Sequence, residues 1–201
     1  MPTPLEIVAV PFEVWVGPIG EAFPAINATP AGNWVKLGTR GALNIREPGV
    51  TVSHGQTVEL VRMSGDTLPI KAFRTEEDIR ISFTLSDLTL ENYNRAVNMG
   101  SVTDTAAGSG VAGHRAIDLR QGLDVEQRAL LIRGANASPY LASTNVQYEV
   151  PVAVQVGTPS AVYSKGEPVG LEMEWAILVD LNAATAAKRA GVLRMMDENP
   201  T

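Results

Sequence analysis

Hydrophobic and polar residues alternate over much of this chain, which is the pattern of β-strands with one buried face. The alternation is strict in residues 79–85 and 171–177 and longest in residues 146–156. Pro151 lies inside the longest stretch and has no backbone N–H to donate, so we expect an unpaired edge or a bulge there. These patterns predict antiparallel strands that each cover a core on one side. Shorter patterns between turn residues predict strands at 12–16, 33–37, 57–63, 71–74, 114–121 and 128–133.

One α-helix is predicted from residue 90 to residue 99. Thr89 is suited to cap its first turn, and Gly100 is suited to end it. Leu90, Tyr93 and Val97 form one apolar stripe, so the helix should pack on the sheet.

The ends of the chain lack enough apolar residues to fold on themselves. Residues 1–11 predict an extended N-terminal arm, and residues 183–201 predict a C-terminal tail. Just before that tail, Asn182 is suited to cap a short helix that reaches Ala190, followed by a loose end. With no second core, residues 1–201 form a single domain. The predicted fold is mainly β: an antiparallel β-sandwich or barrel with one flanking α-helix, long loops and extended terminal arms.

Composition excludes several classes of protein. The chain has 16 Lys and Arg against 22 Asp and Glu, a net charge of −6, which argues against a strongly basic nucleic-acid binder. Cysteine is absent, so a disulfide scaffold and a thiol nucleophile are excluded. We expect a soluble chain without a secretory signal, because no basic segment precedes an apolar one and no apolar run approaches ~18 residues.

No motif predicts a catalytic, cofactor or metal site. Residues 108–113 match the string G-x-G-x-x-G, but the preceding buried strand and the following helix of a dinucleotide site are missing, so a loop is predicted. The only histidines, His54 and His114, have no partners that their spacing identifies.

An acidic segment, Glu76-Glu77-Asp78, lies between Arg74 and Arg80. Paired carboxylates can transfer protons or bind a hard cation. The favoured interpretation is a solvated turn between two strands, with local salt bridges. A third interpretation is a salt bridge between subunits.

Three stretches resemble the tail tube (major tail) proteins of tailed bacteriophages with long non-contractile tails, and those of related gene-transfer particles. They are residues 12–18, residues 33–38, and residues 71–78 leading through 81–85 into 87–92. The last is the most specific, because its order of strand, long hairpin loop, strand and Leu-Thr-Leu-Glu helix is typical of the middle of the family's sequences.

The resemblance implies a structural protein and not an enzyme. Subunits of this family form rings, usually hexameric, whose inner strands join into one large β-barrel. The rings stack into a tube around the tape-measure protein, and DNA later passes through without specific binding. Further implied partners are the tail terminator and distal tail proteins. The implied location is the virion tail, after synthesis in the host bacterial cytoplasm, with no membrane partner.

Residues 63–78 are predicted to contact other subunits, because their mixed apolar and charged side chains are unsuited to free solvent. The predicted interface residues are Met63, Asp66, Leu68, Ile70, Lys71, Arg74, Glu76, Glu77 and Asp78. Candidates for the lumen surface are Glu172 and Glu174, or Arg80, Ser82 and Thr84.

Two other classes stay open. One is a different tail or head-completion protein, such as a tail terminator or the inner tube of a contractile system. The other is a β-sandwich binding module, for instance for a carbohydrate, although only 5% of residues are aromatic.

Overall fold

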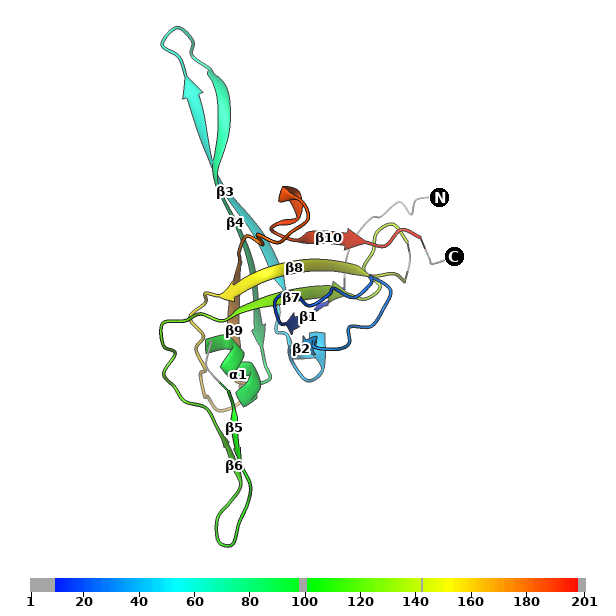
Figure 1. Cartoon of the computed structure of the whole chain (residues 1–201), viewed down its shortest axis with the longest axis vertical. Helices are drawn as coiled ribbons and strands as arrows, with labels where there is room; N and C mark the ends of the chain where they lie inside the picture. The colour runs from blue at the N-terminus through cyan, green and yellow to red at the C-terminus, as the bar shows by residue number, and fades with distance from the viewer. Residues whose placement is uncertain (1–9, 98–100, 142, 199–201) are drawn as a thin grey trace.

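The computed structural model describes residues 10–97, 101–141 and 143–198, and nearly all of its strands join one antiparallel sheet. Eight strands form this sheet in the order β2-β1-β7-β8-β9-β4-β3, with β10 also paired to β8 (Figure 1). A separate two-stranded sheet pairs β5 with β6. The strands are β1 (Phe12–Gly17), β2 (Val35–Lys36), β3 (Thr51–Arg62), β4 (Pro69–Leu85), β5 (Thr103–Thr105), β6 (His114–Ala116), β7 (Gln127–Gly134), β8 (Val146–Gln155), β9 (Leu171–Ile177) and β10 (Val192–Met195).

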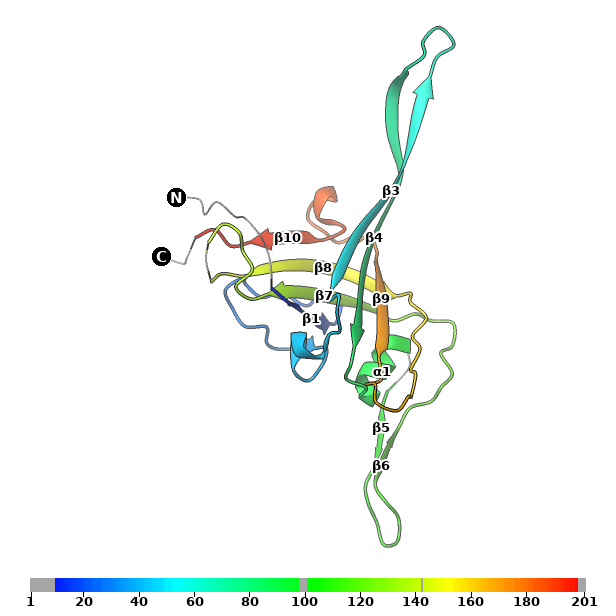
Figure 2. The same ribbon diagram turned by 180° about the vertical axis from the view of Figure 1, so that it is seen from behind.

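The large sheet divides into two leaves because two strands share one edge of β8. The first half of β8, residues 146–149, pairs with β10, and residues 153–155 pair with β9. The first leaf (β2, β1, β7, β8 and β10) runs across the view in Figures 1 and 2, whereas the second leaf (β9, β4 and β3) follows the long axis. The fold is therefore mainly antiparallel β, as predicted, but its sheet does not close into a barrel.

The core lies between the two leaves. The second leaf contributes Ile81, Phe83 and Leu85 from β4, all at most 4% exposed. The first leaf supplies apolar side chains from β1, β7 and β8 to the same cluster. This confirms the predicted alternation in residues 79–85, and Leu171, Met173 and Trp175 confirm it on β9.

Pro151 lies in a gap between pairing partners, as its missing N–H predicts. On one edge it falls between the residues that pair with β10 and those that pair with β9. On the other edge, the register with β7 shifts between Arg128 and Leu130. The proline therefore sits where no ladder hydrogen bond is needed.

The predicted helix is α1 (Leu90–Val97), and Thr89 caps it: the Asn92 amide donates to Thr89 Oγ1 at 3.2 Å. Its Ala96 and Val97 are buried, and the helix contacts β8 and β9. The predicted end at Gly100 lies outside the described residues.

The first leaf differs from the prediction of one-sided strands, because it is covered on both faces. On its far face, Trp34 packs with Ala129 and Leu131. Beside this cluster Arg133 is buried, and it donates to Gln147 Oε1 at 3.1 Å and to the Ala25 carbonyl at 3.1 Å. Polar residues that the sequence pattern predicts to face solvent are therefore buried here, where they form long-range hydrogen bonds with the loop before β2.

The C-terminal tail also differs from expectation, because residues 192–195 form β10 and not a loose end. The predicted short helix is a single 3-10 turn, Ala186–Lys188, preceded by Thr185. Residues 1–9 of the predicted N-terminal arm lie outside the described residues.

Three other predicted segments have different lengths in the structure. Of the strand predicted at 114–121, only the residues of β6 form a strand. The strand β5 lies inside a segment that is predicted as a loop. The strand predicted at 57–63 begins earlier, at Thr51.

Candidate subunit-interaction surface

The β3–β4 hairpin extends far beyond the body of the molecule (Figure 1). Only residues 80–85 of β4 pair with β9, so the rest of β4 has β3 as its sole strand partner in the described chain. The register shifts between Thr57 and Val58 and leaves Thr75 as an extra residue on β4. We call the hairpin beyond this bulge, residues 58–74, the arm.

One face of the arm carries apolar side chains together with Arg74, which lies opposite Val58. Val58 and Leu60 alternate along β3 with the same phase as Val52, which packs against the core, and Leu60 lies opposite Ala72. His54 and Gln56 interrupt this face between Val52 and Val58, so the apolar side chains of the arm are separate from the core, and nothing in the described chain covers them. Val58 is 45% exposed and Leu60 52% exposed.

The tip of the arm exposes three further large apolar side chains, Met63, Leu68 and Ile70. The turn itself is held locally: Asp66 Oδ1 accepts the Leu68 amide at 3.1 Å, and Arg62 Nη1 donates to the Thr67 carbonyl at 2.9 Å. These bonds order the backbone but leave the apolar side chains in solvent.

The opposite face of the arm is amphipathic. The Lys71 ammonium lies 4.8 Å from the centroid of the Phe73 ring, and Glu59 lies opposite Phe73 across the hairpin. Phe73 is 49% exposed, so the cation–π contact covers the ring only in part.

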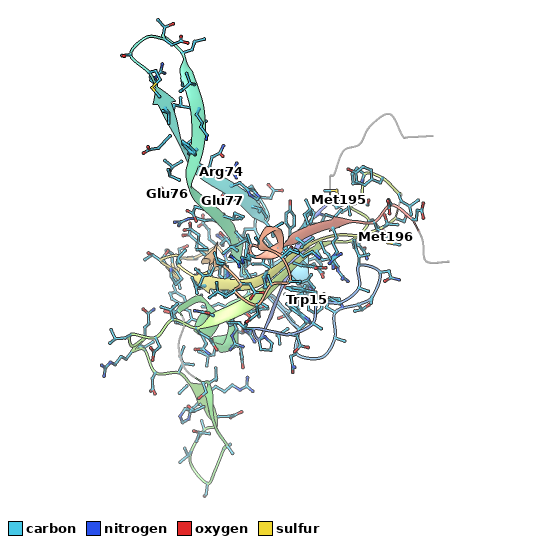
Figure 3. All side chains as sticks on the ribbon, turned by 45° about the horizontal axis from the view of Figure 1, so that its top comes forward. Trp15, Arg74, Glu76, Glu77, Met195 and Met196 are labelled. Carbon is cyan, nitrogen blue, oxygen red and sulfur yellow. The ribbon has the colours of Figure 1, made fainter. Side chains whose placement is uncertain are left out.

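The acidic segment lies at the base of the arm, within β4 (Figure 3). The interpretation as a turn is therefore wrong, because Glu76, Glu77 and Asp78 each pair with a residue of β3. The expected local salt bridges are present: Arg80 Nε lies 2.7 Å from Asp78 Oδ2, and Arg74 Nη1 lies 3.9 Å from Glu77 Oε2. This segment forms a strand without alternating apolar residues because neither of its faces is buried.

All nine residues of the predicted interface thus lie on this one hairpin, from its tip to its base. Sequence reasoning missed Val58, Leu60 and Phe73, whose side chains are about half exposed. The alternation of residues 57–63 indicates Val58 and Leu60, but alternation alone does not reveal that the body ends below them.

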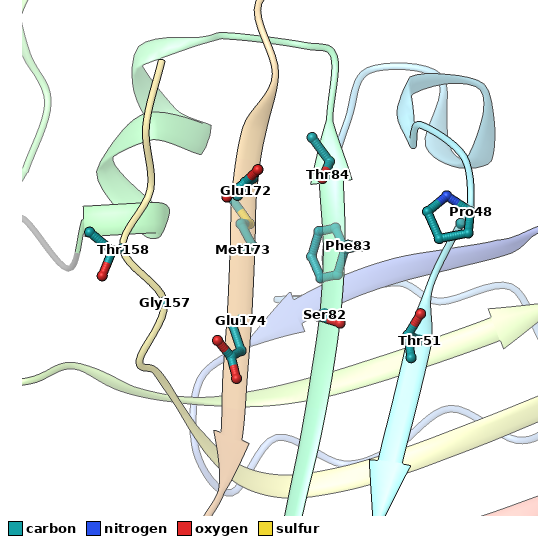
Figure 4. A pocket seen from close by; sticks show the side chains of 11 residues that line it. Pro48, Thr51, Ser82, Phe83, Thr84, Gly157, Thr158, Glu172, Met173 and Glu174 are labelled. Carbon is teal, nitrogen blue, oxygen red and sulfur yellow. The ribbon is translucent and has the colours of Figure 1, made fainter. Parts of the chain in front are cut away.

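The solvent face of the second leaf is polar. Ser82 lies opposite Glu174 and Thr84 opposite Glu172, so the two alternative sets of lumen candidates share one face. These four residues, with Thr51 and Gly157, line a shallow hollow of about 220 Å³ (Figure 4).

Arg80 stands at the edge of this polar face nearest the arm. Hydrogen bonds from Arg80 to Glu174 and Asp78 raise the pKa of its guanidinium above the ordinary arginine value. The arginine therefore remains charged and links β9 to the base of the arm.

The remaining candidate residues do not form a catalytic or metal-binding site in the described chain. Residues 108–113 form the tip of the β5–β6 hairpin, as predicted for a loop. His54 is on β3 and His114 on β6, and within residues 10–97, 101–141 and 143–198 no three His, Asp or Glu side chains are grouped to hold a metal ion. No helix in the described part of the chain is long and apolar enough to cross a membrane.

Compared with known proteins, this sequence matches no protein-family model and no curated protein.

Proposed function

We propose that this chain is the tail tube subunit of a tailed bacteriophage, or of a gene-transfer particle, with a long non-contractile tail. Subunits would join into rings, and the rings would stack into a tube that carries DNA to the host. The observation that carries the proposal is the arm, a long ribbon with exposed apolar side chains.

The physical argument begins with the stability of the arm. A two-stranded hairpin by itself is marginal in water, and exposed strand edges favour pairing with other chains. Within the described residues both edges are open, because β3 is the last strand of its sheet and β4 pairs only with β3 before Arg80. A neighbouring subunit would cover the apolar side chains and pair the free edges.

The polar face of the second leaf supports the same function. Its side chains Ser82, Thr84, Glu172 and Glu174 are hydroxyls and carboxylates, and Arg80 at its edge is already paired with Asp78 and Glu174. A basic lumen would hold DNA by releasing counterions and would slow its passage. We therefore assign this face to the lumen, where a weakly repulsive wall lets DNA slide.

Negative-stain microscopy and sedimentation of the purified chain, over a range of concentrations, test the proposal. The expected result is hollow tubes of stacked rings at high concentration. Rings that never stack would indicate a tail terminator or head-completion protein. A chain that stays monomeric overturns the proposal, and melting shifts with added carbohydrates would then favour a binding module.

A further inference from the structure

The strand β10 leaves one edge of the first leaf open. It pairs with β8 on one side, and in the described chain no backbone hydrogen bond joins residues 192–195 to any other segment. Figures 1 and 2 show β10 as the last labelled strand at that margin of the leaf. A free edge of this kind presents N–H and C=O groups to which a further strand can add.

Hollows adjoin β10 on both faces of the leaf. Leu193 faces the core side, as does the β8 residue opposite it, and a hollow of about 190 Å³ lies there, lined mainly by apolar side chains that include Val52 and Ile177. Arg194 faces the other side, where a hollow of about 530 Å³ is lined by Ile26 and by the residues that follow β10. A strand added at this edge would therefore place alternate side chains beside an apolar hollow and beside an arginine.

Residues 5–10 have the sequence pattern of such a strand. They lie between Pro4 and Pro11 and read Leu-Glu-Ile-Val-Ala-Val, so Glu6 is their only polar residue. In an extended segment, Leu5 and Ile7 share one face and Glu6 lies on the other. One face thus suits the apolar hollow, and the other carries a carboxylate that suits the arginine of β10.

This segment cannot lie along β10 of its own subunit. Phe12 pairs with Gly134, Gly134 with Val146, and Val146 with Met195, so the chain enters the leaf in the same row in which β10 ends. The outer edge of β10 is four strand spacings from β1, or ~19 Å. Extended residues cover ~3.3 Å each, so residues 6–11 are used up in the crossing. The segment therefore fits the β10 edge of another copy.

From these observations we propose that residues 5–8 of one subunit add an antiparallel strand to β10 of a second copy of this chain. Glu6 then lies opposite Arg194 and Ile7 opposite Leu193, and Pro4 falls beyond the end of β10, where it need not donate a hydrogen bond. The pairing rests on the proposed self-assembly. It makes each subunit both donor and acceptor of a strand, so the contact is heterologous and repeats from copy to copy.

The charges at this edge set the register of the added strand. Arg194 Nε lies 2.7 Å from Glu149 Oε1, yet the arginine side chain is 51% exposed, and a guanidinium has five N–H donors. Glu6 can therefore bind it as a second carboxylate. Asp197 and Glu198 also line the larger hollow, but they follow β10 and lie beyond Pro4 in this register.

Cysteine cross-linking tests the pairing, because the chain has no cysteine of its own. One batch of full-length chain carries Ile7→Cys and another carries Leu193→Cys, and the two are mixed at high concentration and oxidised with diamide. Side chains directly opposite each other in a sheet have Cβ atoms ~4.5–5.5 Å apart, which a disulfide can bridge after a small adjustment. Mass spectrometry should find covalent dimers joined between positions 7 and 193.

The matched control for the cross-link is Leu43→Cys, mixed with Ile7→Cys in the same way. Leu43 is 83% exposed and lies in the 3-10 turn Gly41–Asn44, beyond β2 at the opposite margin of the first leaf. This mixture should give only the background of random collisions. A chain that carries both Ile7→Cys and Leu193→Cys, oxidised at high dilution, should form no bond within one chain.

Hydrogen exchange gives a second measurement that needs no cysteine. A synthetic peptide with the sequence of residues 2–10 is added to a variant that lacks residues 2–9. The peptide should slow exchange of the amides of residues 192–195, because an added strand covers the edge of β10. The same peptide with Glu6→Lys should bind about two- to fivefold more weakly, as expected for one lost exposed ion pair.

The outcomes separate this pairing from the proposed function. If the wild-type chain never forms tubes, the proposed function fails, whether or not positions 7 and 193 cross-link between copies. If tubes form but the cross-link is no more frequent than in the control, and the peptide leaves exchange at β10 unchanged, the pairing is overturned and self-assembly stands. A bond formed within one chain at high dilution also overturns it, because the segment then covers its own β10.

Discussion

Arg80 on β4 and Glu174 on β9 form an ion pair, with 2.8 Å between Nη1 and Oε1, at the point where β4 leaves the second leaf. Arg80 is the last residue of β4 toward the arm that pairs with β9. Its Nε also binds Asp78, which lies two residues further toward the arm, where β4 pairs only with β3 in the described chain. One guanidinium thus fixes the base of the arm to the body.

Replacing Arg80 by Gln should loosen the base of the arm without unfolding the body. Exposed ion pairs add little to global stability, so the melting temperature should change little. Hydrogen exchange of the amides of residues 76–79 should become faster, because local opening of the ribbon becomes easier. Arg128→Gln, which breaks an exposed ion pair with Glu126 away from the arm, is the control. Unchanged exchange at residues 76–79 would contradict this role.

Removing the tip of the arm, residues 64–69, should leave a folded chain that no longer forms tubes. In the described part of the chain none of these residues belongs to the core or packs against it, so circular dichroism and the cooperative melt should match the wild type. Normal tubes formed by this deletion variant would contradict the assignment of the arm as an interface.

A milder change tests the apolar side chains themselves. Leu68→Ser with Ile70→Ser should weaken assembly while keeping the ribbon, because each lost side chain removes apolar area from the contact. Leu43 and Val162 are as exposed but lie outside the arm, so Leu43→Ser with Val162→Ser is the matched control. Equal effects of the two double variants on tube formation would argue against a specific contact.

Arg133→Met should destabilise the body, because the buried arginine satisfies several oxygen atoms at once. It donates to Gln147 and to the Ala25 and Ala28 carbonyls. Burial lowers the pKa of Arg133, and the nearby Glu149 and Glu13 oppose that shift. Leaving these acceptors unsatisfied should cost about 2–4 kcal/mol of unfolding free energy, measured by urea denaturation. Arg128→Met should cost less than about 1 kcal/mol, and similar losses for both variants would refute the argument.

Gly191→Ala should displace β10 from β8. Gly191 has φ +116°, and an added Cβ would collide with the Glu149 carbonyl oxygen. A strained backbone of this kind costs about 1–3 kcal/mol, which a four-residue strand cannot easily offset. Gly108→Ala, where a Cβ meets only open space, is the control. We expect faster hydrogen exchange in residues 192–195 for Gly191→Ala alone, and equal exchange in both variants would be contrary evidence.

The sequence by itself determined the local elements of this protein. Alternation with period two assigns the side chains of residues 79–85 and 171–177 to faces, and Thr89 marks the start of the helix, because these signals depend only on neighbouring residues. The interface candidates at the tip of the hairpin were also evident, since turn residues and apolar side chains occur together there.

Only the tertiary structure decided which strands have neighbours and which faces are covered. The acidic segment became part of a strand because β3 supplies its hydrogen bonds, and residues 192–195 became β10 because β8 has a free edge there. Arg133 is buried because a loop more than a hundred residues away covers it. Backbone pairing and burial depend on partners that are distant in sequence. A local pattern of polar and apolar residues does not identify those partners.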